Sequence, residues 1–258
     1  MKVYLDNAAT TPIAKEVISE ISPYLSDYFG NPSSTHSFGR KTKNAIEITR
    51  KKIADLINAD SSEIVFTSGG TEADNMALRS SVLDLGVKRI ITTKLEHHAV
   101  CHTAEELKEK HKIELIYLDT DDLGHINLDQ LELLLANDTK TLVSLMHANN
   151  EIGTLLPIQK VSDICNKSHV LFHSDTVQTM GHYTFDTKET KIDFLACAAH
   201  KFHGPKGCGF LYQNKNLKTS PLITGGSQER NSRGGTENLY GIVGLGKAMD
   251  LAYTDLSK

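Results

Sequence analysis

The sequence predicts an α/β fold in which a mostly parallel sheet is covered by helices, giving three α/β/α layers. Seven short apolar runs recur along the chain, and segments with helical periodicity separate most of them. Strands that alternate with helices are typical of parallel sheets that are buried on both faces. The 258 residues contain no internal repeat, low-complexity stretch or linker. We therefore expect one large domain over residues 1–258.

The predicted elements follow one another in a regular order. Strands are predicted at residues 64–66, 89–92, 113–118, 141–146, 170–172, 192–197 and 209–212. Helices are predicted at residues 45–57, 72–85, 99–110 and 158–166. A last, long helix is predicted at residues 236–256. Because no strand precedes its glycines, we interpret them as positions of close helix packing: Gly241, Gly244 and Gly246.

The composition excludes several classes of protein. The net charge of −4 and the lack of a basic stripe argue against nucleic-acid binding. No apolar stretch is long enough to span a membrane, and the first residues lack the apolar region of a signal peptide. The four cysteines show no CxxC motif and no framework spacing, which suits a reducing compartment. We therefore expect a cytoplasmic protein without membrane contact.

A lysine and an acid follow two of the predicted strands, at the sheet edge where such folds bind ligands. Lys201 comes after the run at 192–197, and Asp175 comes after the run at 170–172. A lysine that forms a Schiff base, with an acid that keeps a pyridine nitrogen protonated, is the arrangement that pyridoxal 5′-phosphate (PLP) requires. Each residue alone is more often a surface lysine or a capping acid, so the prediction depends on the rest of the chain.

Other strand ends carry groups that suit the same cofactor. Gly70 and Thr71 begin a predicted helix, whose free N–H groups and dipole favour an anion, although a plain capped turn fits equally well. His97 could stack on a ring and move protons, or it could cap a helix. A metal site with Cys101 and His102 is disfavoured because no further ligand lies nearby in the sequence, and we predict no metal ligand.

Three further polar groups complete the candidate site. Asn150, in the segment after the run at 141–146, could bind a substrate carboxylate or a ring hydroxyl, although a turn rich in Asn and Gly is the commoner structure. Gln178 could reach the phenolic oxygen of the ring, and His200 could contact the phosphate. The loops at 225–230 and 233–236 could supply donors to an anion, or they could be ordinary solvated loops.

Together these motifs resemble the NifS-like cysteine desulfurases, which belong to the class V aminotransferase group of fold-type I PLP-dependent transferases. They occur in the family's order from one end of the chain to the other: YLDNAATTP at 4–12, GNPSSTH at 30–36, TSGGTE at 67–72, EH at 96–97, HANNEIG at 147–153, DTVQ at 175–178, AHK at 199–201 and RGGT at 233–236. Any one of these motifs is weak, whereas eight in order are specific.

The resemblance implies a role for each matching position. Lys201 would form the Schiff base, Asp175 would hold the ring nitrogen, Gln178 the phenolic oxygen, and His97 would stack on the ring and act in acid–base steps. Asn150 would contact substrate or ring; Gly70, Thr71 and His200 would bind the phosphate, together with Thr236 reaching across from the partner subunit of a homodimer. The implied reaction converts L-cysteine to L-alanine and leaves a persulfide, whose sulfur passes to an acceptor or scaffold protein for iron–sulfur cluster assembly or thiolation.

The sequence departs from this family at two places. Ala198 stands where the family usually has a serine that binds the phosphate, so we expect weaker retention of PLP. The family's nucleophilic cysteine and substrate-binding arginine lie in a C-terminal small domain, and we expect residues 1–258 to be only the PLP-binding large domain, with the N-terminal segment and the start of the linking helix. The apolar faces of that segment and of the last helix would then be exposed, giving poor solubility as a monomer.

The four cysteines offer no clear substitute for the missing nucleophile. Cys165, Cys197 and Cys208 lie in apolar settings, and Cys101 beside His102 is the least unfavourable candidate. We expect all four to be structural. Two alternatives therefore stay open: a catalytically silent PLP-binding fragment or half of a split enzyme, and a selenocysteine lyase or aminotransferase of the same group.

Overall fold

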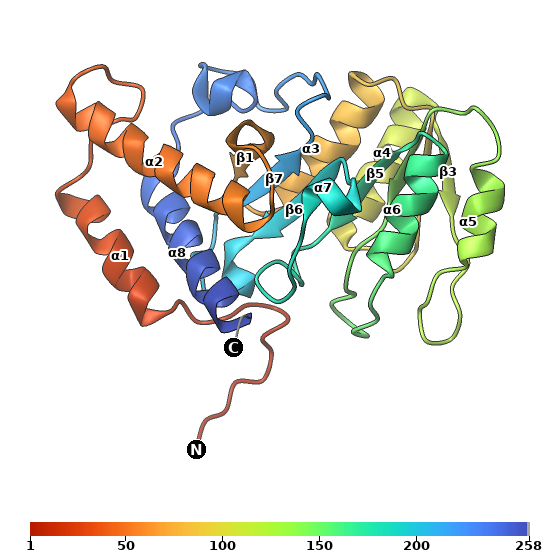
Figure 1. Cartoon of the computed structure of the whole chain (residues 1–258), viewed down its shortest axis with the longest axis horizontal. Helices are drawn as coiled ribbons and strands as arrows, with labels where there is room; N and C mark the ends of the chain where they lie inside the picture. The colour runs from red at the N-terminus through yellow and green to blue at the C-terminus, as the bar shows by residue number, and fades with distance from the viewer. Residues whose placement is uncertain (257–258) are drawn as a thin grey trace.

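The computed structural model describes residues 1–256, which form a seven-stranded sheet with helices on both faces (Figure 1). The strand order is β1-β7-β6-β5-β4-β2-β3. All seven predicted strands are present: β1 Ile64–Thr67, β2 Arg89–Thr92, β3 Glu114–Tyr117, β4 Thr141–Ser144, β5 Leu171–Asp175, β6 Phe194–Ala198 and β7 Gly209–Gln213. Neighbours from β3 to β6 are parallel, whereas β7 is antiparallel to both β1 and β6. The predicted α/β class with a mostly parallel sheet is confirmed.

The α-helices include the five that periodicity predicts and three that it missed, α1, α5 and α7. The α-helices are α1 Lys15–Ser26, α2 Ser37–Leu56, α3 Gly70–Leu83, α4 His98–His111, α5 Leu128–Leu134, α6 Ile158–Lys167, α7 Thr187–Thr190 and α8 Leu239–Leu256. The 3₁₀ helices are η1 Ser61–Glu63, η2 Ala199–Lys201 and η3 Gln228–Asn231. Pro23 lies inside α1, where proline argues against a helix, and α5 and α7 are too short to show a period. In residues 1–256, no helix has both the length and the apolar character that crossing a bilayer requires.

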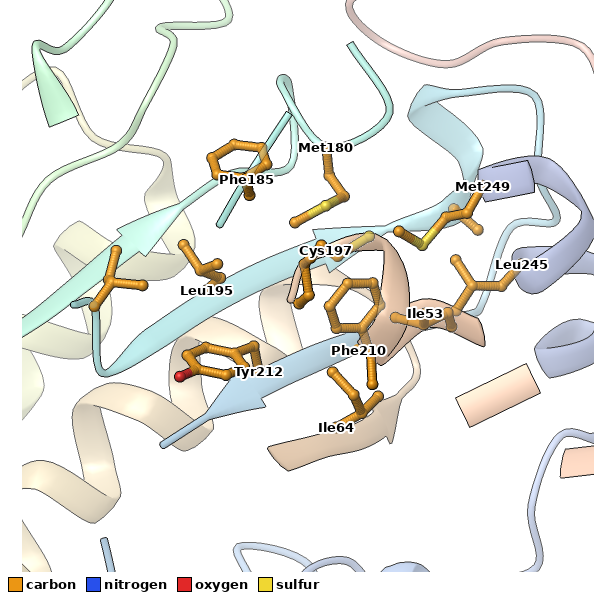
Figure 2. Packing of buried hydrophobic residues seen from close by; sticks show 14 of the residues in the cluster. Ile53, Ile64, Met180, Phe185, Leu195, Cys197, Phe210, Tyr212, Leu245 and Met249 are labelled. Carbon is orange, nitrogen blue, oxygen red and sulfur yellow. The ribbon is translucent and has the colours of Figure 1, made fainter. Parts of the chain in front are cut away.

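Two separate apolar cores explain the three layers. Alternate residues of a strand face opposite sides of the sheet. Leu195 and Phe210 therefore belong to the core on one side, with residues of α2, α6 and α8, whereas Phe194 and Leu211 belong to the core on the other side, with residues of α3 and α4. Figure 2 shows the first core, where side chains of β6 and β7 lie against α2 and α8.

The expectation that the last helix exposes its apolar face is wrong. Helix α8 packs against α1 and α2, at the end of the molecule where β1 lies (Figure 1). Its glycines permit this close approach: a Cβ at Gly244 would lie 2.6 Å from Pro205, and one at Gly246 would lie 2.6 Å from the Thr49 methyl group. The N-terminal residues do carry exposed apolar side chains, including Leu5 at 86% exposure, so poor solubility as a monomer stays a prediction.

The contact between Gly246 and Thr49 predicts a specific coupling. Gly246→Ala should destabilise the protein by about 1–2 kcal/mol, because the overpacking cost exceeds the gain in helix propensity. Thr49→Ser removes only the methyl group that the new Cβ would strike. In the Thr49→Ser background, Gly246→Ala should therefore be neutral or stabilising. Urea unfolding of the four proteins in this cycle measures the coupling, and additive effects would contradict the packing argument.

Candidate active site

A cavity of about 440 Å³ lies at the carboxyl ends of the parallel strands, beside the start of α3 and of α4. Parallel strands end at the same edge of a sheet, so polar residues at their ends converge there. Eight of the nine residues predicted from the sequence line this cavity: Gly70, Thr71, His97, Asn150, Asp175, Gln178, His200 and Lys201. The lining also includes residues to which sequence reasoning gave no role, among them Asp6, Ala8, Ala9, Asp74, Glu151 and Val177.

Lys201 reaches the cavity from η2, directly after β6. Its Nζ donates to the carbonyl oxygens of Ala8 and, at 3.1 Å, of Ala9. Burial lowers the pKa of the Lys201 amine below its ordinary value, although Asp175 and Asp6 oppose this shift. A lowered pKa favours the neutral amine, which is the nucleophilic form.

The N-terminal segment forms one wall of the cavity. Its Ala8 carbonyl also accepts a hydrogen bond from Nε2 of Gln178 at 3.0 Å. Thr11 and Thr10 fix the segment to His200, through Thr11 N to the His200 carbonyl at 2.9 Å and through Thr10 Oγ1 to Nδ1 of His200 at 3.1 Å. The motif at 4–12 therefore holds three cavity residues in place: Lys201, Gln178 and His200. It does so through its backbone and through the Thr10 hydroxyl.

Asp175 is the last residue of β5, and it is only 4% exposed. One of its carboxylate oxygens accepts a hydrogen bond from the backbone N–H of Val177 at 2.8 Å. Burial and the neighbouring Asp74 raise the pKa of Asp175 to about 7, while His173 and His97 act in the opposite direction. A buried carboxyl that titrates near neutrality is well placed to ionise when a cation faces it.

The start of α3 is built to receive an anion. Gly69 precedes the helix with a φ of +150°, which favours glycine, and a Cβ on Gly70 would collide with the Val177 side chain. The first N–H groups of a helix have no acceptor within the helix, so at Gly70 and Thr71 they are free for a ligand. Glu72 fixes this turn, because it accepts a hydrogen bond from Ser68 N at 2.8 Å and pairs with Arg233 at 2.9 Å.

His97 has the capping role that the sequence left open, whereas stacking on a ring and moving protons stay predictions. It is the N-cap residue of α4, and its Nδ1 accepts a hydrogen bond from Ala99 N at 3.1 Å. Because Nδ1 uses its lone pair there, the neutral ring carries its proton on Nε2. The ring is exposed and lines the cavity. The thiol of Cys101 lies instead near the carbonyls of Thr93 and Glu96, 3.6–3.8 Å away.

The two asparagines after β4 have different functions in the fold. Asn149 is buried, with its amide donating to the Leu95 carbonyl at 2.6 Å and its oxygen accepting from the N–H groups of Glu151 and Ile152. It is the structural turn residue that the composition of this segment favours. Asn150 lines the cavity, and its amide donates to Glu151 at 2.7 Å, so its contact with substrate or ring stays a prediction.

Thr236 lies apart from this cavity. It lines a second cavity of about 150 Å³, together with Ser68, Arg233 and the first residues before α8. The expectation that Thr236 reaches a cofactor across a dimer interface therefore stays a prediction.

The cysteines match their predicted structural role. All four are free thiols, and Cys165, Cys197 and Cys208 are buried. Burial raises the pKa of Cys101 to about 11 and that of Cys208 to about 12, and it raises the pKa of the other two thiols as well. Among residues 1–256, none of these thiols lines the cavity at the strand ends.

The donor set suits PLP group by group. The protein offers a primary amine for the aldehyde of PLP and a buried carboxyl for its pyridine nitrogen. It also offers an amide for the phenolic oxygen and a helix N-terminus for the phosphate. These groups are Lys201, Asp175, Gln178 and the Gly70–Thr71 turn, and all of them line one cavity. The close contact of Gly70 with Val177, which a side chain at position 70 would block, fixes this turn at the edge of the cavity.

Comparisons with known proteins agree with this site. The family model described as Aminotransferase class-V matches residues 3–257. The chain is 52% identical over 262 residues to cysteine desulfurase IscS of Dictyoglomus turgidum and 48% identical over 259 residues to that of Methanosarcina thermophila. These alignments include 100% and 99% of this chain but only 65% and 63% of the relatives. The chain thus spans about two thirds of the length of the curated relatives that it matches.

Solved structures give the same result. A NifS-like protein superimposes with a TM-score of 0.95 at 40% identity, covering 100% of this chain and 71% of the other. SspA in complex with cysteine superimposes with a TM-score of 0.92 at 38% identity, covering 96% and 72%. With a family model that spans almost every residue, the chain belongs to the class-V aminotransferases, a family of PLP-dependent enzymes.

Proposed function

We propose that this chain is the PLP-binding large domain, residues 1–258, of a cysteine desulfurase that converts L-cysteine to L-alanine. The observation that carries the proposal is the convergence of Lys201, Asp175 and His97 on one cavity at the strand ends. Relatives that bear the name cysteine desulfurase, at 46–52% identity, support the choice of reaction within the family. The solved relative in complex with cysteine supports the choice of substrate.

In this proposal each side chain has a defined task toward the cofactor. PLP supplies an electron sink, which makes bonds at the substrate α-carbon easier to break. Asp175 carries the negative charge that keeps the ring nitrogen protonated, and Gln178 donates its amide to the phenolic oxygen. The Gly70–Thr71 turn and His200 bind the phosphate, and Asn150 binds substrate or ring.

Proton movement falls to Lys201 and His97. The Lys201 amine, which burial keeps easier to deprotonate than an ordinary lysine, accepts and returns a proton at Nζ. His97 holds its proton on Nε2, since Nδ1 is engaged as the helix cap. The ring of His97 can therefore donate from Nε2 without disturbing the start of α4.

The sulfur needs a thiol acceptor that lies outside this cavity. In the balanced reaction, L-cysteine and a thiol RSH give L-alanine and the persulfide RSSH. The C–S bond of cysteine breaks, a hydrogen takes the place of the SH group on that carbon, and the sulfur forms an S–S bond with the thiol. No thiol among residues 1–256 lines the cavity. We therefore propose that a further cysteine-bearing segment or an acceptor protein supplies the thiol, in a cytoplasmic homodimer that serves iron–sulfur cluster assembly or thiolation.

An assay with PLP-loaded protein and L-cysteine tests this function. We expect L-cysteine to change the visible spectrum of the bound cofactor, and L-alanine to form in amounts that depend on an added thiol such as dithiothreitol. Mass spectrometry should find no persulfide on Cys101, Cys165, Cys197 or Cys208. A spectrum that does not respond to L-cysteine but responds to another amino acid would overturn the choice of substrate.

A chain that binds PLP and transfers no sulfur by itself is the second candidate. The absence of a cavity thiol among the described residues favours it. The same assay separates the two functions, because a silent chain would give a cofactor spectrum and no L-alanine at any thiol concentration.

The alanine at position 198 predicts a measurable weakness. Ala198 lines the cavity, only 2% exposed, close to the Gly70 turn. Ala198→Ser would place a hydroxyl there, and a hydrogen bond to a charged phosphate contributes about 1.5–3 kcal/mol. We expect the variant to release PLP at least about tenfold more slowly, measured by transfer of PLP to an excess of an apo-enzyme that traps it. Ala199→Ser, one residue further and not in the cavity lining, is the matched control, and equal release rates would contradict the prediction.

A further inference from the structure

A second buried acid lies beneath the cavity, and no step described above uses it. Asp74, in the second turn of α3, is 1% exposed and lines the cavity. Its Oδ1 lies 3.3 Å from Nε2 of His173, which is 0% exposed. On the other side of the ring, Nδ1 of His173 lies 2.8 Å from Oγ of Ser144. The sequence gives no hint of this chain, because its members come from α3, β5 and β4.

Asp74 also lies close to the groups that we assign to the ring of PLP. One ligand atom each from Asp74, His97 and Asp175 lie within 4.8 Å of one another. Glu96 is a third buried carboxyl that interacts with both Asp74 and Asp175. Among residues 1–256, Asp74 forms no ion pair with a lysine or arginine, and its contact with His173 is its one pairing with a basic side chain.

Oδ1 of Asp74 and Nε2 of His173 are both buried, and neither has another hydrogen-bond partner within residues 1–256, so one hydrogen between them would satisfy both atoms. A carboxylate oxygen and an unprotonated imidazole nitrogen both accept, so two bare acceptors would repel one another at 3.3 Å. Burial raises the pKa of Asp74 to about 8 and lowers the pKa of His173 to about 4. A neutral His173 still carries one hydrogen, on Nδ1 or on Nε2. Asp74 is 1% exposed, pairs with no lysine or arginine among residues 1–256, and has two other buried carboxyls nearby. This setting favours a hydrogen on Asp74, donated to Nε2, with Nδ1–H of His173 donating to Ser144.

We propose that Asp74 is a positioning residue that stays protonated in a hydrogen bond to His173, so that Asp175 carries the single negative charge at the ring-nitrogen end of the cavity. Two carboxylates this close would each disfavour the charge on the other. A protonated Asp74 keeps the polar wall intact without competing with Asp175 for the ring-nitrogen proton. This inference rests on the PLP site of the proposed function, but the proton on Asp74 can be measured without PLP.

The first experiment follows aspartate carboxyls in the cofactor-free chain. Labelling aspartate with ¹³C at the side-chain carboxyl and recording NMR spectra against pH should reveal a carboxyl that titrates near pH 8. Asp74→Asn should remove that signal, and Asp74→Ser assigns it independently if the first variant does not fold. Asp175→Asn and Asp193→Asn should each keep it, although both of these acids also titrate above the ordinary range, near 7 and 6.

The second experiment examines the PLP-loaded protein. In Asp74→Asn, the side-chain amide still donates an N–H to His173 and carries no charge. The pH midpoint of the cofactor's visible band should therefore be the same in this variant as in the unchanged chain. Asp74→Ala removes the donor and should weaken PLP binding by roughly fivefold, with Asn restoring it.

A carboxyl signal that titrates near pH 4 in the apo chain, or a band midpoint that moves by about one unit or more in Asp74→Asn, would overturn the proposal. If no variant binds PLP, the function above fails, while the apo titration still decides the state of Asp74.

Discussion

The Lys201→Ala variant is expected to lose the visible absorption band of lysine-bound PLP completely. Lys201 is the only lysine among the residues that line the cavity, so within residues 1–256 no other amine can take its place there. Alanine formation from L-cysteine should fall by about 10²-fold or more, because the same amine moves the proton. The far-ultraviolet circular dichroism should stay unchanged, since the Lys201 amine bonds only to the N-terminal segment.

Lys206 provides the matched control for this experiment. It lies in the same loop, five residues further along, and it is exposed and outside the cavity. Lys206→Ala should therefore keep the absorption band and its intensity. A band that survives in Lys201→Ala, or that disappears equally in both variants, would contradict the assignment of Lys201.

The pH dependence of cofactor attachment adds a second measurement. Because burial lowers the pKa of Lys201, its amine loses the proton at a lower pH than an exposed lysine does. The rate at which PLP attaches to the apo chain should therefore reach its plateau at a lower pH than its rate of attachment to a lysine-containing peptide. A plateau at the same pH would mean that the cavity does not activate this amine.

The strand-and-helix order could be predicted because most of the strands are apolar runs with both faces buried; the edge strand β3, which is only partly buried, is the exception. The cavity residues could be predicted for the same reason, since Asp175 and Lys201 follow strands whose ends meet at one edge. The direction of β7 could not be predicted, because an apolar run is the same in either direction. Helix α2 begins at Ser37, eight residues before the predicted start, because its first turns are polar and show no apolar period.

Residues that act through distant partners could not be found from the sequence. Asp74 reads as an ordinary polar residue of a helix, and only the fold brings it to His173. The wall formed by Ala8 and Ala9 depends on backbone carbonyls, which the side-chain sequence does not reveal. The family motif at 4–12 was the one signal that could have pointed to this wall.

The largest stability effect is expected from Glu229, which forms a buried ion pair with Arg50. Their side chains are 2% and 3% exposed, and the two hydrogen bonds between them measure 2.7 and 2.8 Å. Glu229 also accepts from Phe66 N at 2.8 Å, and Arg50 donates to the Ile64 carbonyl at 2.7 Å, so the pair joins α2, β1 and η3. Breaking such a pair leaves an uncompensated buried charge.

The backbone of η3 makes this pair more important. Glu229, Arg230 and Asn231 have φ values of +46°, +56° and +70°, three successive residues in the left-handed region that non-glycine residues disfavour. Each such residue costs of order 1–3 kcal/mol and persists only when surrounding contacts hold it. The ion pair supplies that restraint for the loop that continues to Thr236.

Glu229→Gln should therefore destabilise the protein by about 3–5 kcal/mol, a fall in Tm of roughly 6–20 °C for a chain of this size. Asp55→Asn, in the helix α2 that carries Arg50, is the matched control, since the pair of Asp55 with Lys51 is exposed at 63% and 69% and contributes at most about 1 kcal/mol. The double variant Arg50→Met, Glu229→Leu should recover part of the loss, because no charge is left buried alone. Calorimetry on the four proteins measures these differences, and a cost for Glu229→Gln as small as that for Asp55→Asn would mean that the left-handed loop is held by other contacts.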